Sequence, residues 1–266
     1  MDRLPPSRTV ALLITLPLLF SPLIHAAVSG HPAGGAGTPA SLAVATYAGS
    51  EEQVRSVRAL VRSLRERGGP YRDSVVHVVL TDPDRVPGEA LRGAGVELVP
   101  LALEPAVLNY PLALKAFAAA EVERRVREKA ASLAWLDPGV LVLKPPAALD
   151  LGRAFDATVR PVSLANTVGI LPGSPPDAYW APIYAATGLD YRALPALETV
   201  VDTVPIQPYY NCEVYAVNPE LGICAEWAQL LSALLNDAAY QQAACTTFLK
   251  RLFLHQAVLS AVLQAR

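Results

Sequence analysis

The chain has 266 residues, which is enough for one large domain or two small ones. Its formal net charge of −2 at pH 7 gives no sign of the basic face that a nucleic-acid-binding protein presents. The hydrophobic fraction of 52% is high, partly because of the first thirty residues.

The N-terminus has the pattern of a targeting segment. Arg3 and Arg8 precede an apolar stretch from Thr9 to Ile24, and small residues follow it. The stretch is shorter than the roughly 20 residues of a membrane-spanning helix. The pattern predicts that residues 1–29 are a cleaved signal peptide or an uncleaved signal anchor. Either would place the body of the protein on the non-cytosolic side.

A flexible lead-in is expected over residues 30–40, followed by a single domain from residue 41 to 266. Its first half alternates strands with helices, which predicts an α/β fold with a mainly parallel sheet. The helices should run from a capping box at Ser50 and Gln53 to Gly68, and from Pro111 to about Ala130. Strands are expected at residues 41–46, 75–80, 96–101, 133–136 and 140–143.

The second half is richer in proline and aromatic residues, especially over residues 145–210, where long loops suit a lid or a substrate wall. A strand followed by a turn is expected over residues 210–219, and helices at about 219–236 and 239–264. The aromatic side chains of this half could stack on sugars or form a small core of their own; they are Tyr179, Trp180, Tyr184, Tyr209 and Tyr210.

Three cysteines allow at most one disulfide within the chain. Cys224 and Cys245 are the candidate pair in an oxidising compartment, and buried free thiols are the alternative for these two and Cys212. The cysteine spacings fit no zinc site. The chain has no Gly-x-Gly-x-x-Gly sequence and no phosphate-binding P-loop, which argues against a dinucleotide site.

The most informative segment is Leu133–Leu143, in which Asp137 separates two apolar runs. A carboxylate there would lie where a strand leaves the core, and ligands of open α/β sheets bind at the carboxyl ends of strands. No Ser-His-Asp or Cys-His arrangement stands out, so hydrolase chemistry has no support.

Several short motifs follow one another in a recognisable order: Thr46-Tyr47, Lys115, Asp137, Asn211 and His255-Gln256. This order resembles glycosyltransferase family 8, the glycogenin-like type with the GT-A fold, over about residues 41–264. The resemblance implies a GT-A-like sheet flanked by helices. It also implies transfer of a sugar from a nucleotide diphosphate sugar to a hydroxyl acceptor.

The resemblance implies a role for each matching residue. Thr46, Tyr47, Lys115 and His255 would bind the nucleotide sugar. The catalytic positions would be Asp137, Asn211, Glu213 and Gln256.

Three positions depart from the family pattern. Gly139 replaces the second carboxylate of the Asp-x-Asp motif, Glu213 replaces a glycine, and His255 replaces an aspartate. A late histidine that would ligate the metal has no counterpart. Mn²⁺ or Mg²⁺ is the cofactor that the family uses, yet Asp137 alone would hold such an ion weakly, because these ions need several oxygen ligands. The enzyme is therefore expected to be metal-independent. Alternatively the fold has lost its chemistry and binds a glycan or a protein.

Each candidate also has a structural interpretation. Asp137 could cap the turn before Pro138, Lys115 could be a solvated helix charge, and Asn211 could bond its local backbone. Glu213 could simply face solvent, and His255 could pack near the sheet. His77 is expected to be structural.

The expected partners are a nucleotide diphosphate sugar donor and a glycan or protein acceptor. No nucleic acid is expected, and a membrane only through the N-terminal segment. The expected location is the Golgi or ER lumen or the exterior, or the periplasm in a bacterium. If the resemblance holds, Asp137, Lys115, Asn211 and Gln256 should meet at the carboxyl edge of the sheet. Glu213 and His255 should then lie within contact distance of each other or of Asp137.

Overall fold

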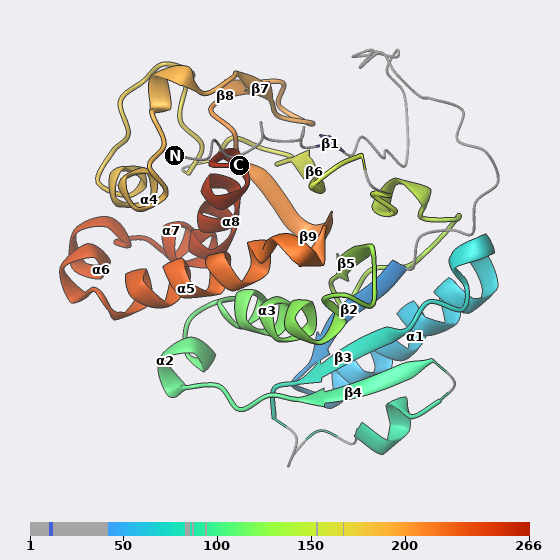
Figure 1. The fold of residues 1–266 in the computed structure, drawn as a ribbon. Coiled ribbons are helices and arrows are strands. Elements are labelled where there is room, and N and C mark those ends of the chain that lie inside the picture. Colours follow the sequence, from blue (N-terminus) through green and yellow to red (C-terminus); the bar gives the residue numbers. More distant parts are fainter. Residues whose placement is uncertain are drawn as a thin grey trace, which may run out of the picture.

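The computed structural model describes residues 11–12, 42–82, 86, 88–93, 95–152, 154–166 and 168–266. Their main feature is a seven-stranded sheet in the order β1-β6-β9-β5-β2-β3-β4 with helices on both faces (Figure 1). Its strands are β1 (Ala11–Leu12), β2 (Leu42–Ala48), β3 (Val76–Leu80), β4 (Val96–Pro100), β5 (Ser132–Leu136), β6 (Ala157–Pro161) and β9 (Tyr210–Val217). A separate two-stranded ribbon consists of β7 (Leu197–Glu198) and β8 (Pro205–Ile206).

The described helices are α1 (Glu51–Arg67), α2 (Pro105–Leu108), α3 (Leu114–Val126), α4 (Trp180–Thr187), α5 (Ile223–Asn236), α6 (Ala238–Ala244), α7 (Phe248–Leu252) and α8 (Leu254–Gln264). Short 3-10 turns occur at η1 (Gly69–Tyr71), η2 (Gly88–Leu91), η3 (Ala147–Leu149), η4 (Tyr191–Ala193) and η5 (Pro219–Leu221). Within the part of the chain that the structure describes, no helix combines the length and the apolar character needed to cross a bilayer.

The predicted α/β fold with a mainly parallel sheet is confirmed. β2 lies between β3 and β5, β4 adds to β3, and all of these pairs are parallel. Only β9 runs the other way, inserted between β5 and β6. Parallel strands bring their carboxyl ends to one edge, so the segments that follow β2, β3 and β5 meet there.

The first helix forms as its sequence predicts. The hydroxyl of Ser50 accepts a hydrogen bond from the Gln53 amide at 3.2 Å, and the Gln53 side chain accepts one from the Gly49 amide at 2.7 Å. Four buried positions, Val54, Val57, Leu60 and Leu64, recur at helical spacing and pack on one face of the sheet. The helix ends at Arg67, and Gly68 follows as its C-cap.

The opposite face of the sheet carries a larger core beneath α3, α5 and α8. It includes a row of aromatic rings: Tyr47 stacks on Trp135, Trp135 stacks on Tyr215, and Tyr215 meets Trp227 edge-on. The row crosses the sheet from β2 to β9 and continues onto α5. It places large rigid side chains directly below the carboxyl edge.

Two predicted elements near that edge differ in the structure. Pro111 does not open a long helix: Leu112 has a φ of +56°, which interrupts the chain between α2 and α3. Residues 140–143 are not a strand either. Val142 is buried and its amide donates to the Ser63 hydroxyl of α1 at 2.9 Å, instead of joining a sheet.

The predicted helix over residues 239–264 is divided into α6, α7 and α8. The break has a local cause, because Thr247 adopts an extended conformation and its hydroxyl caps α7 by accepting from the Lys250 amide at 3.2 Å. Cys212, Cys224 and Cys245 are all buried free thiols, so the candidate Cys224–Cys245 disulfide is absent and the alternative is confirmed.

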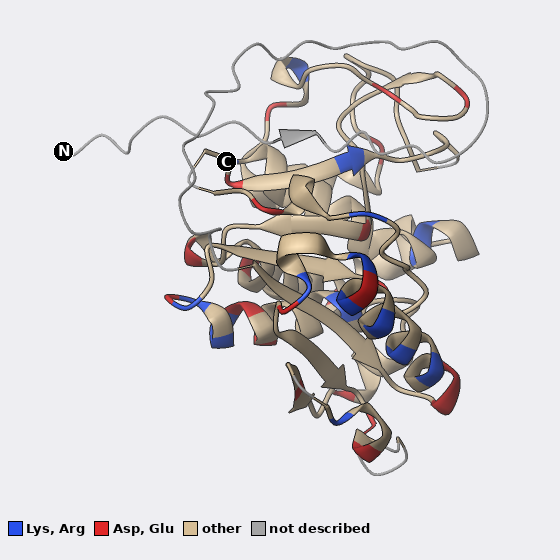
Figure 2. Ribbon diagram, turned by 90° about the vertical axis from the view of Figure 1, so that its right-hand side faces the viewer, with Lys and Arg blue, Asp and Glu red and all other residues tan. Residues whose placement is uncertain are grey.

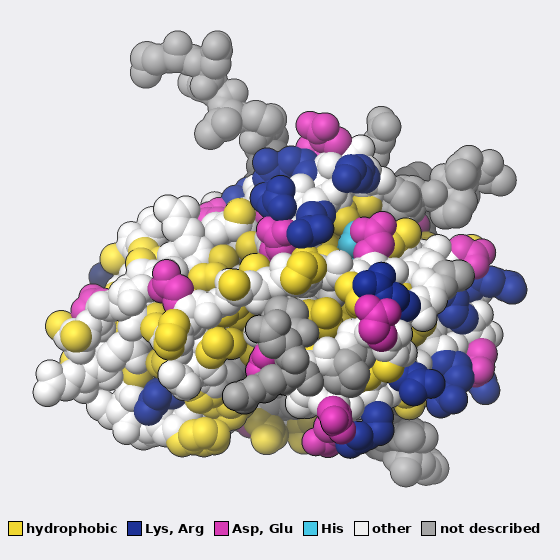
Figure 3. All heavy atoms as spheres, turned by 90° about the horizontal axis from the view of Figure 1, so that it is seen from below, with side chains coloured by type: hydrophobic (Ala, Val, Ile, Leu, Met, Phe, Trp, Pro, Cys, Tyr) yellow, Lys and Arg dark blue, Asp and Glu magenta, His cyan; other side chains and the backbone are white. Residues whose placement is uncertain are grey.

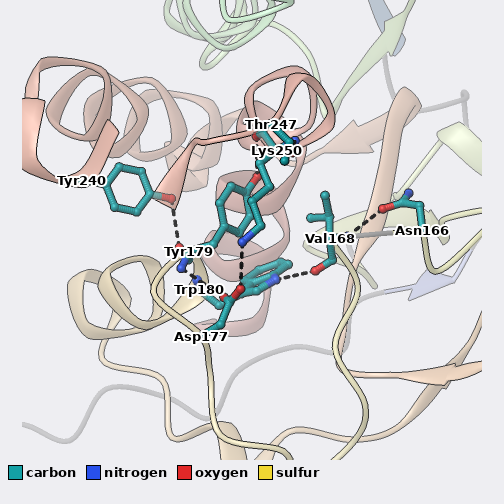
Figure 4. A network of polar contacts seen from close by, with 8 residues as sticks. All are labelled: Asn166, Val168, Asp177, Tyr179, Trp180, Tyr240, Thr247 and Lys250. Carbon is teal, nitrogen blue, oxygen red and sulfur yellow. Dashed lines mark hydrogen bonds and ion pairs between the residues drawn. The ribbon is translucent and has the colours of Figure 1, made fainter. Parts of the chain in front are cut away.

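The aromatic residues of the proline-rich segment belong to the large core beneath α3, α5 and α8, and Figure 4 shows two of them, Tyr179 and Trp180, with their polar partners. The Trp180 indole donates to the Val168 carbonyl at 2.6 Å, and the Tyr240 hydroxyl donates to the Tyr179 carbonyl at 2.9 Å. Lys250 lies over the Tyr179 ring and pairs with Asp177 at 3.0 Å. All five predicted stacking residues are buried, so they are not available to sugars; they are part of the large core and do not form a small one of their own.

The predicted targeting segment and lead-in lie outside the described residues, apart from Ala11 and Leu12. These two form β1, a short edge strand parallel to β6. The cleavage and anchoring predictions remain predictions.

Candidate functional site

Asp137 lies at the carboxyl end of β5, at the edge to which the parallel strands point. One carboxylate oxygen accepts a hydrogen bond from the Trp135 indole at 2.8 Å, and the other is 2.5 Å from the Lys115 ammonium. Its backbone amide donates to the Glu213 carbonyl at 2.9 Å. Both side-chain oxygens are therefore engaged by the protein, and the turn-capping interpretation of this side chain is wrong.

Lys115 reaches Asp137 from the first turn of α3 and is only 3% exposed, so it is not a solvated helix charge. Burial by itself would lower the pKa of Lys115, but Cys212 and Asp137 together raise it. Burial raises the pKa of Asp137, while the Lys115 ammonium and the Trp135 hydrogen bond oppose that rise. We conclude that the pair is held as an ion pair at neutral pH, because each charge is compensated by the other.

Tyr47, at the end of β2, lies between this ion pair and Gln53 of α1. Burial raises the pKa of the Tyr47 hydroxyl, and so does the nearby Asp137 carboxylate, while Lys115 and Gln53 lower it. The ring stacks on Trp135 with centroids 6.1 Å apart. Tyr47 is thus fixed by packing on one side and by polar neighbours on the other.

A hollow of about 620 Å³ opens beside Tyr47, between the segments that follow β2 and β3. Its polar lining comes from Ser50, Gln53, Thr81 and Asp82, and its apolar lining from Ala102, Leu103, Leu108 and Leu114. The size lies within the range of small-molecule sites, which is roughly 300–1,000 Å³. Gly49 leaves little room for a larger residue, because a Cβ would lie 2.4 Å from the Thr81 hydroxyl and would force that side chain to move.

Three buried polar side chains lie on the inner side of the Lys115–Asp137 ion pair. The Cys212 thiol faces the Gln256 side-chain oxygen at 3.7 Å, and burial raises the pKa of Cys212 to about 12. His255 is buried next to them, and its Nδ1 donates to the Leu252 carbonyl at 2.9 Å. Its Nε2 has no hydrogen-bond partner. Burial and the Lys115 charge hold the pKa of His255 well below its ordinary value.

The outer rim of the site consists of residues from β9 and β6. The Asn211 side chain accepts from the Glu213 amide at 2.8 Å, which is the local backbone bond expected of a structural asparagine. Glu213 is 56% exposed and its carboxylate lies 3.4 Å from the Arg160 guanidinium. The register of β9 shifts against β6 at this point, and such an irregularity re-aims side chains at the edge of a sheet.

The structure brings most of the predicted residues together. Tyr47, Lys115, Asp137 and Gln256 surround one buried polar centre, and Asn211 and Glu213 flank it on the outside. Thr46 is different: it is fully buried and lies outside the lining of the hollow.

The Glu213 backbone carbonyl accepts a hydrogen bond from the Asp137 amide. Glu213 therefore contacts Asp137, which is one of the two predicted arrangements. No described contact joins Glu213 to His255: one side chain pairs with Arg160 at the surface, whereas the other is buried against Trp227. His77 is buried and faces Glu97 at 3.2 Å, as expected of a structural histidine.

Three members of the site escaped the sequence analysis. Trp135 could have been found, because residues two apart on a strand point to the same face and its indole is a donor next to Asp137. Cys212 sits between Lys115 and Gln256, but a lone cysteine carries no signal in a sequence. Arg160 reaches Glu213 only through the pairing of β6 with β9, which local sequence does not specify.

A divalent cation does not fit these residues. Within the described chain, no three His, Cys, Asp or Glu side chains are grouped so that they could hold a metal ion. Asp137 supplies one carboxylate, and a lysine and a tryptophan already occupy both of its oxygens. Space is not the obstacle, because a Cβ on Gly139 would meet nothing within 4 Å. The missing element is a second oxygen ligand.

The profile of the Rhodobacterales glycosyltransferase domain matches residues 55–266. No curated protein matches the chain. Among solved structures, the galactosyltransferase LgtC, in complex with donor and acceptor sugar analogs, aligns with a TM-score of 0.46. It is 12% identical, and the alignment covers 80% of this chain and 70% of LgtC. The 4-diphosphocytidyl-2C-methyl-D-erythritol synthase of Anaerococcus prevotii aligns with a TM-score of 0.41. It is 11% identical, and the alignment covers 77% of this chain and 81% of the synthase.

Proposed function

Because the chain belongs to the Rhodobacterales glycosyltransferase domain family, we propose that it transfers a sugar from a nucleotide diphosphate sugar to a hydroxyl acceptor. We further propose that it does so without a divalent cation. The proposal of sugar transfer rests on the position of the hollow beside Tyr47. Tyr47 lines this hollow and also lies next to the buried Lys115–Asp137 pair. A nucleotide site and a polar reaction centre would thus adjoin at one edge of the sheet, as the GT-A resemblance implies.

The nucleoside of the donor would occupy the hollow. Leu103, Leu108 and Leu114 supply an apolar wall for a base, and Ser50 and Asp82 offer oxygens to ribose hydroxyls. Tyr47 closes the inner end, next to Asp137. The donor sugar would then extend toward the carboxyl end of β5.

Asp137 is proposed to receive a donor hydroxyl. The carboxylate is 19% exposed, and each oxygen keeps a lone pair beyond its bond to Trp135 or Lys115. Lys115 is too deeply buried to meet the diphosphate and acts as a positioning residue that keeps Asp137 ionised and oriented. His255 and Gln256 lie behind this pair and would support it from the core.

The leaving diphosphate needs positive charge, which in a metal-independent transferase comes from the protein. Arg160 is the candidate, because its side chain is 28% exposed and its only described ion pair, to Glu213, is 3.4 Å long. Glu213 and Asn211 share this outer rim. We propose that they face the acceptor, with Glu213 as the base that takes the proton of its hydroxyl group.

The alternative is a binding module of the same fold that has lost transfer. The engagement of both Asp137 oxygens by the protein favours it. The expected location, outside the cytosol in a Golgi or ER lumen or a bacterial periplasm, remains a proposal. A transferase needs its donor in the same compartment, and a periplasm would not supply one, so a periplasmic location would favour the binding module.

Donor binding can be tested by thermal shift with a panel of nucleotide diphosphate sugars, each with EDTA and with Mn²⁺. A ligand at 100 times its Kd stabilises by about 2.7 kcal/mol, which raises Tm by several degrees. We expect stabilisation by one donor in EDTA, and its loss in Asp137→Asn. Stabilisation that requires Mn²⁺ in the wild type would contradict metal independence. Binding without turnover of any acceptor would favour the binding module.

A gain-of-function variant sharpens this test. Gly139→Asp restores the second carboxylate in open space and should make donor binding stronger with Mn²⁺ than with EDTA. Gly93→Asp is the matched control, because a Cβ at Gly93 also meets nothing within 4 Å but lies away from the site. If both variants respond to Mn²⁺ alike, the effect is one of net charge and not of the site.

A further inference from the structure

Helix α1 presents a row of arginine side chains on its solvent side. Arg55, Arg58 and Arg62 are spaced by three and four residues, which places them on one face of the helix. All three are exposed, and no hydrogen bond or ion pair joins any of them to another residue of the described chain. Figure 2 shows the basic positions repeating along the helix between its acidic ends.

These arginines border a hollow of about 590 Å³ between α1 and η2. Arg65 of α1 also lines it, Arg92 lies on its other side, and Val61, Leu91 and Val96 contribute apolar surface. The acidic residues of α1 are confined to its ends, with Glu51 and Glu52 in the first turn and Glu66 near the last. The middle of the helix is therefore positively charged and uncompensated. In Figure 3 basic side chains, with acidic ones among them, lie on the right-hand side, where α1 lies in Figure 1, and a second basic group lies at the upper centre.

Exposed leucines lie along the other flank of α1. The segment after Gly139 packs on the helix through the bond from the Val142 amide to the Ser63 hydroxyl. On either side of Val142, Leu141 is 54% exposed and Leu143 is 67% exposed. Lys144 follows and is exposed as well. The solvent side of α1 is thus bordered by unpaired guanidinium groups on one flank and by protruding aliphatic side chains on the other.

We propose that this α1 face, defined by Arg55, Arg58, Arg62, Leu141 and Leu143, docks on the surface of an anionic phospholipid membrane. Guanidinium groups complement phosphate head groups, and each basic residue near an anionic leaflet strengthens binding by about fivefold. Exposed leucines suit insertion between head groups. A single-stranded nucleic acid would be held by stacking on aromatic rings, and this face exposes none.

This docking does not depend on the transferase proposal, nor on the N-terminal segment. It would bring the carboxyl edge of the sheet close to the membrane, because Ser50, the N-cap of α1, also lines the donor hollow.

The test is co-sedimentation of the full-length protein with vesicles of phosphatidylcholine alone and of phosphatidylcholine with 25% phosphatidylglycerol. The variants are the triple Arg55→Gln/Arg58→Gln/Arg62→Gln, the double Leu141→Ser/Leu143→Ser, and a control triple, Arg124→Gln/Arg192→Gln/Arg251→Gln. The control removes the same charge from exposed arginines elsewhere. Binding to neutral vesicles measures any contribution of the N-terminal segment, which all variants share.

The expected result is tighter binding to the anionic vesicles, lowered about tenfold or more by the α1 triple and little by the control. High salt should weaken the wild type, and the leucine variant should lose the binding that remains in high salt. Equal binding to both vesicle types, or equal losses in the two triples, would overturn the proposal. So would α1-dependent binding to heparin without binding to anionic vesicles, which would assign the face to a soluble polyanion. Circular dichroism confirms that each variant is folded.

Discussion

Two ion pairs lie on opposite sides of one backbone hydrogen bond at the carboxyl edge of the sheet, and their surroundings differ. The Asp137 amide donates to the Glu213 carbonyl, so the two acidic residues are neighbours. Asp137 pairs with Lys115 at 2.5 Å, with side-chain exposures of 19% and 3%. Glu213 pairs with Arg160 at 3.4 Å, and both side chains remain in contact with solvent.

The comparison distinguishes the ion pair that stabilises the site from the ion pair whose side chains can bind a ligand. A buried pair with good geometry is costly to break, because it leaves an unpaired charge in a medium of low dielectric. An exposed pair contributes little, because water and salt screen it. The inner pair should therefore fix the site, whereas the outer pair can exchange its partner for a ligand at little cost.

The largest effect is expected from Lys115→Met, which keeps the length of the side chain and removes its charge. Asp137 would be left without its cation, and the protein should lose roughly 3–5 kcal/mol of unfolding free energy. Urea unfolding measures this. Lys144→Met, at an exposed lysine, is the control and should change stability by less than about 0.5 kcal/mol.

The double variant Lys115→Met/Asp137→Asn should recover most of that loss, since neither charge is then left alone. If the single variant is as stable as the wild type, the Asp137 carboxylate is hydrated or paired with another cation. The inner pair would then contribute no more to stability than the outer pair.

A second buried carboxylate extends the comparison to one that forms no ion pair within the described residues. Glu123 of α3 accepts from the Cys224 and Ala225 amides, both at 2.9 Å, and so caps the start of α5. Glu123→Gln would turn an amide group toward one of these donors, and we expect a loss of about 1–3 kcal/mol. The exposed Glu89→Gln is the control for thermal unfolding. Equal Tm values for the two variants would mean that this cap is not needed.

The inner cluster also predicts a pH dependence through His255. Burial and the Lys115 charge lower its pKa well below the ordinary 6.5. A group whose pKa is lowered on folding stabilises the protein above its unfolded value, and that stability is lost as the pH falls below about 6.5. The slope should reach at most about 1.4 kcal/mol per pH unit.

His255→Gln should flatten this acid-side loss in urea titrations between pH 7.5 and 5. His77→Gln should flatten it less, because Glu97 partly offsets the effect of burial on the pKa of His77. An unchanged slope in His255→Gln would show that other groups carry the acid sensitivity.

The parts of the fold that sequence could predict are those set by local pattern. The capping residues and apolar spacing of α1 are contained within residues 50–68, and the parallel strands follow from alternation of elements. The break at Leu112 lies at a positive φ that leucine rarely adopts, so local preference does not predict it, whereas the restart at Thr247 follows from the capping hydroxyl of that residue. The contact between Asp137 and Lys115 was expected only because of the family resemblance. The position of Arg160 next to Glu213 depends on the irregular pairing of β6 with β9, which no local sequence pattern encodes.

The smallest effect on stability is expected at the outer pair, where it should contrast with a large effect on function. Glu213→Gln removes an exposed charge that is paired at 3.4 Å, so unfolding free energy should change by less than about 1 kcal/mol, and less still in 0.5 M NaCl. If Glu213 is the base for the acceptor hydroxyl, the same change should lower transfer by about 10²–10⁴-fold without weakening donor binding. Glu198→Gln, at another exposed glutamate, should change neither. A stable Glu213→Gln protein with undiminished transfer would remove Glu213 from the chemistry, and a large loss of stability would show that the outer pair is structural like the inner one.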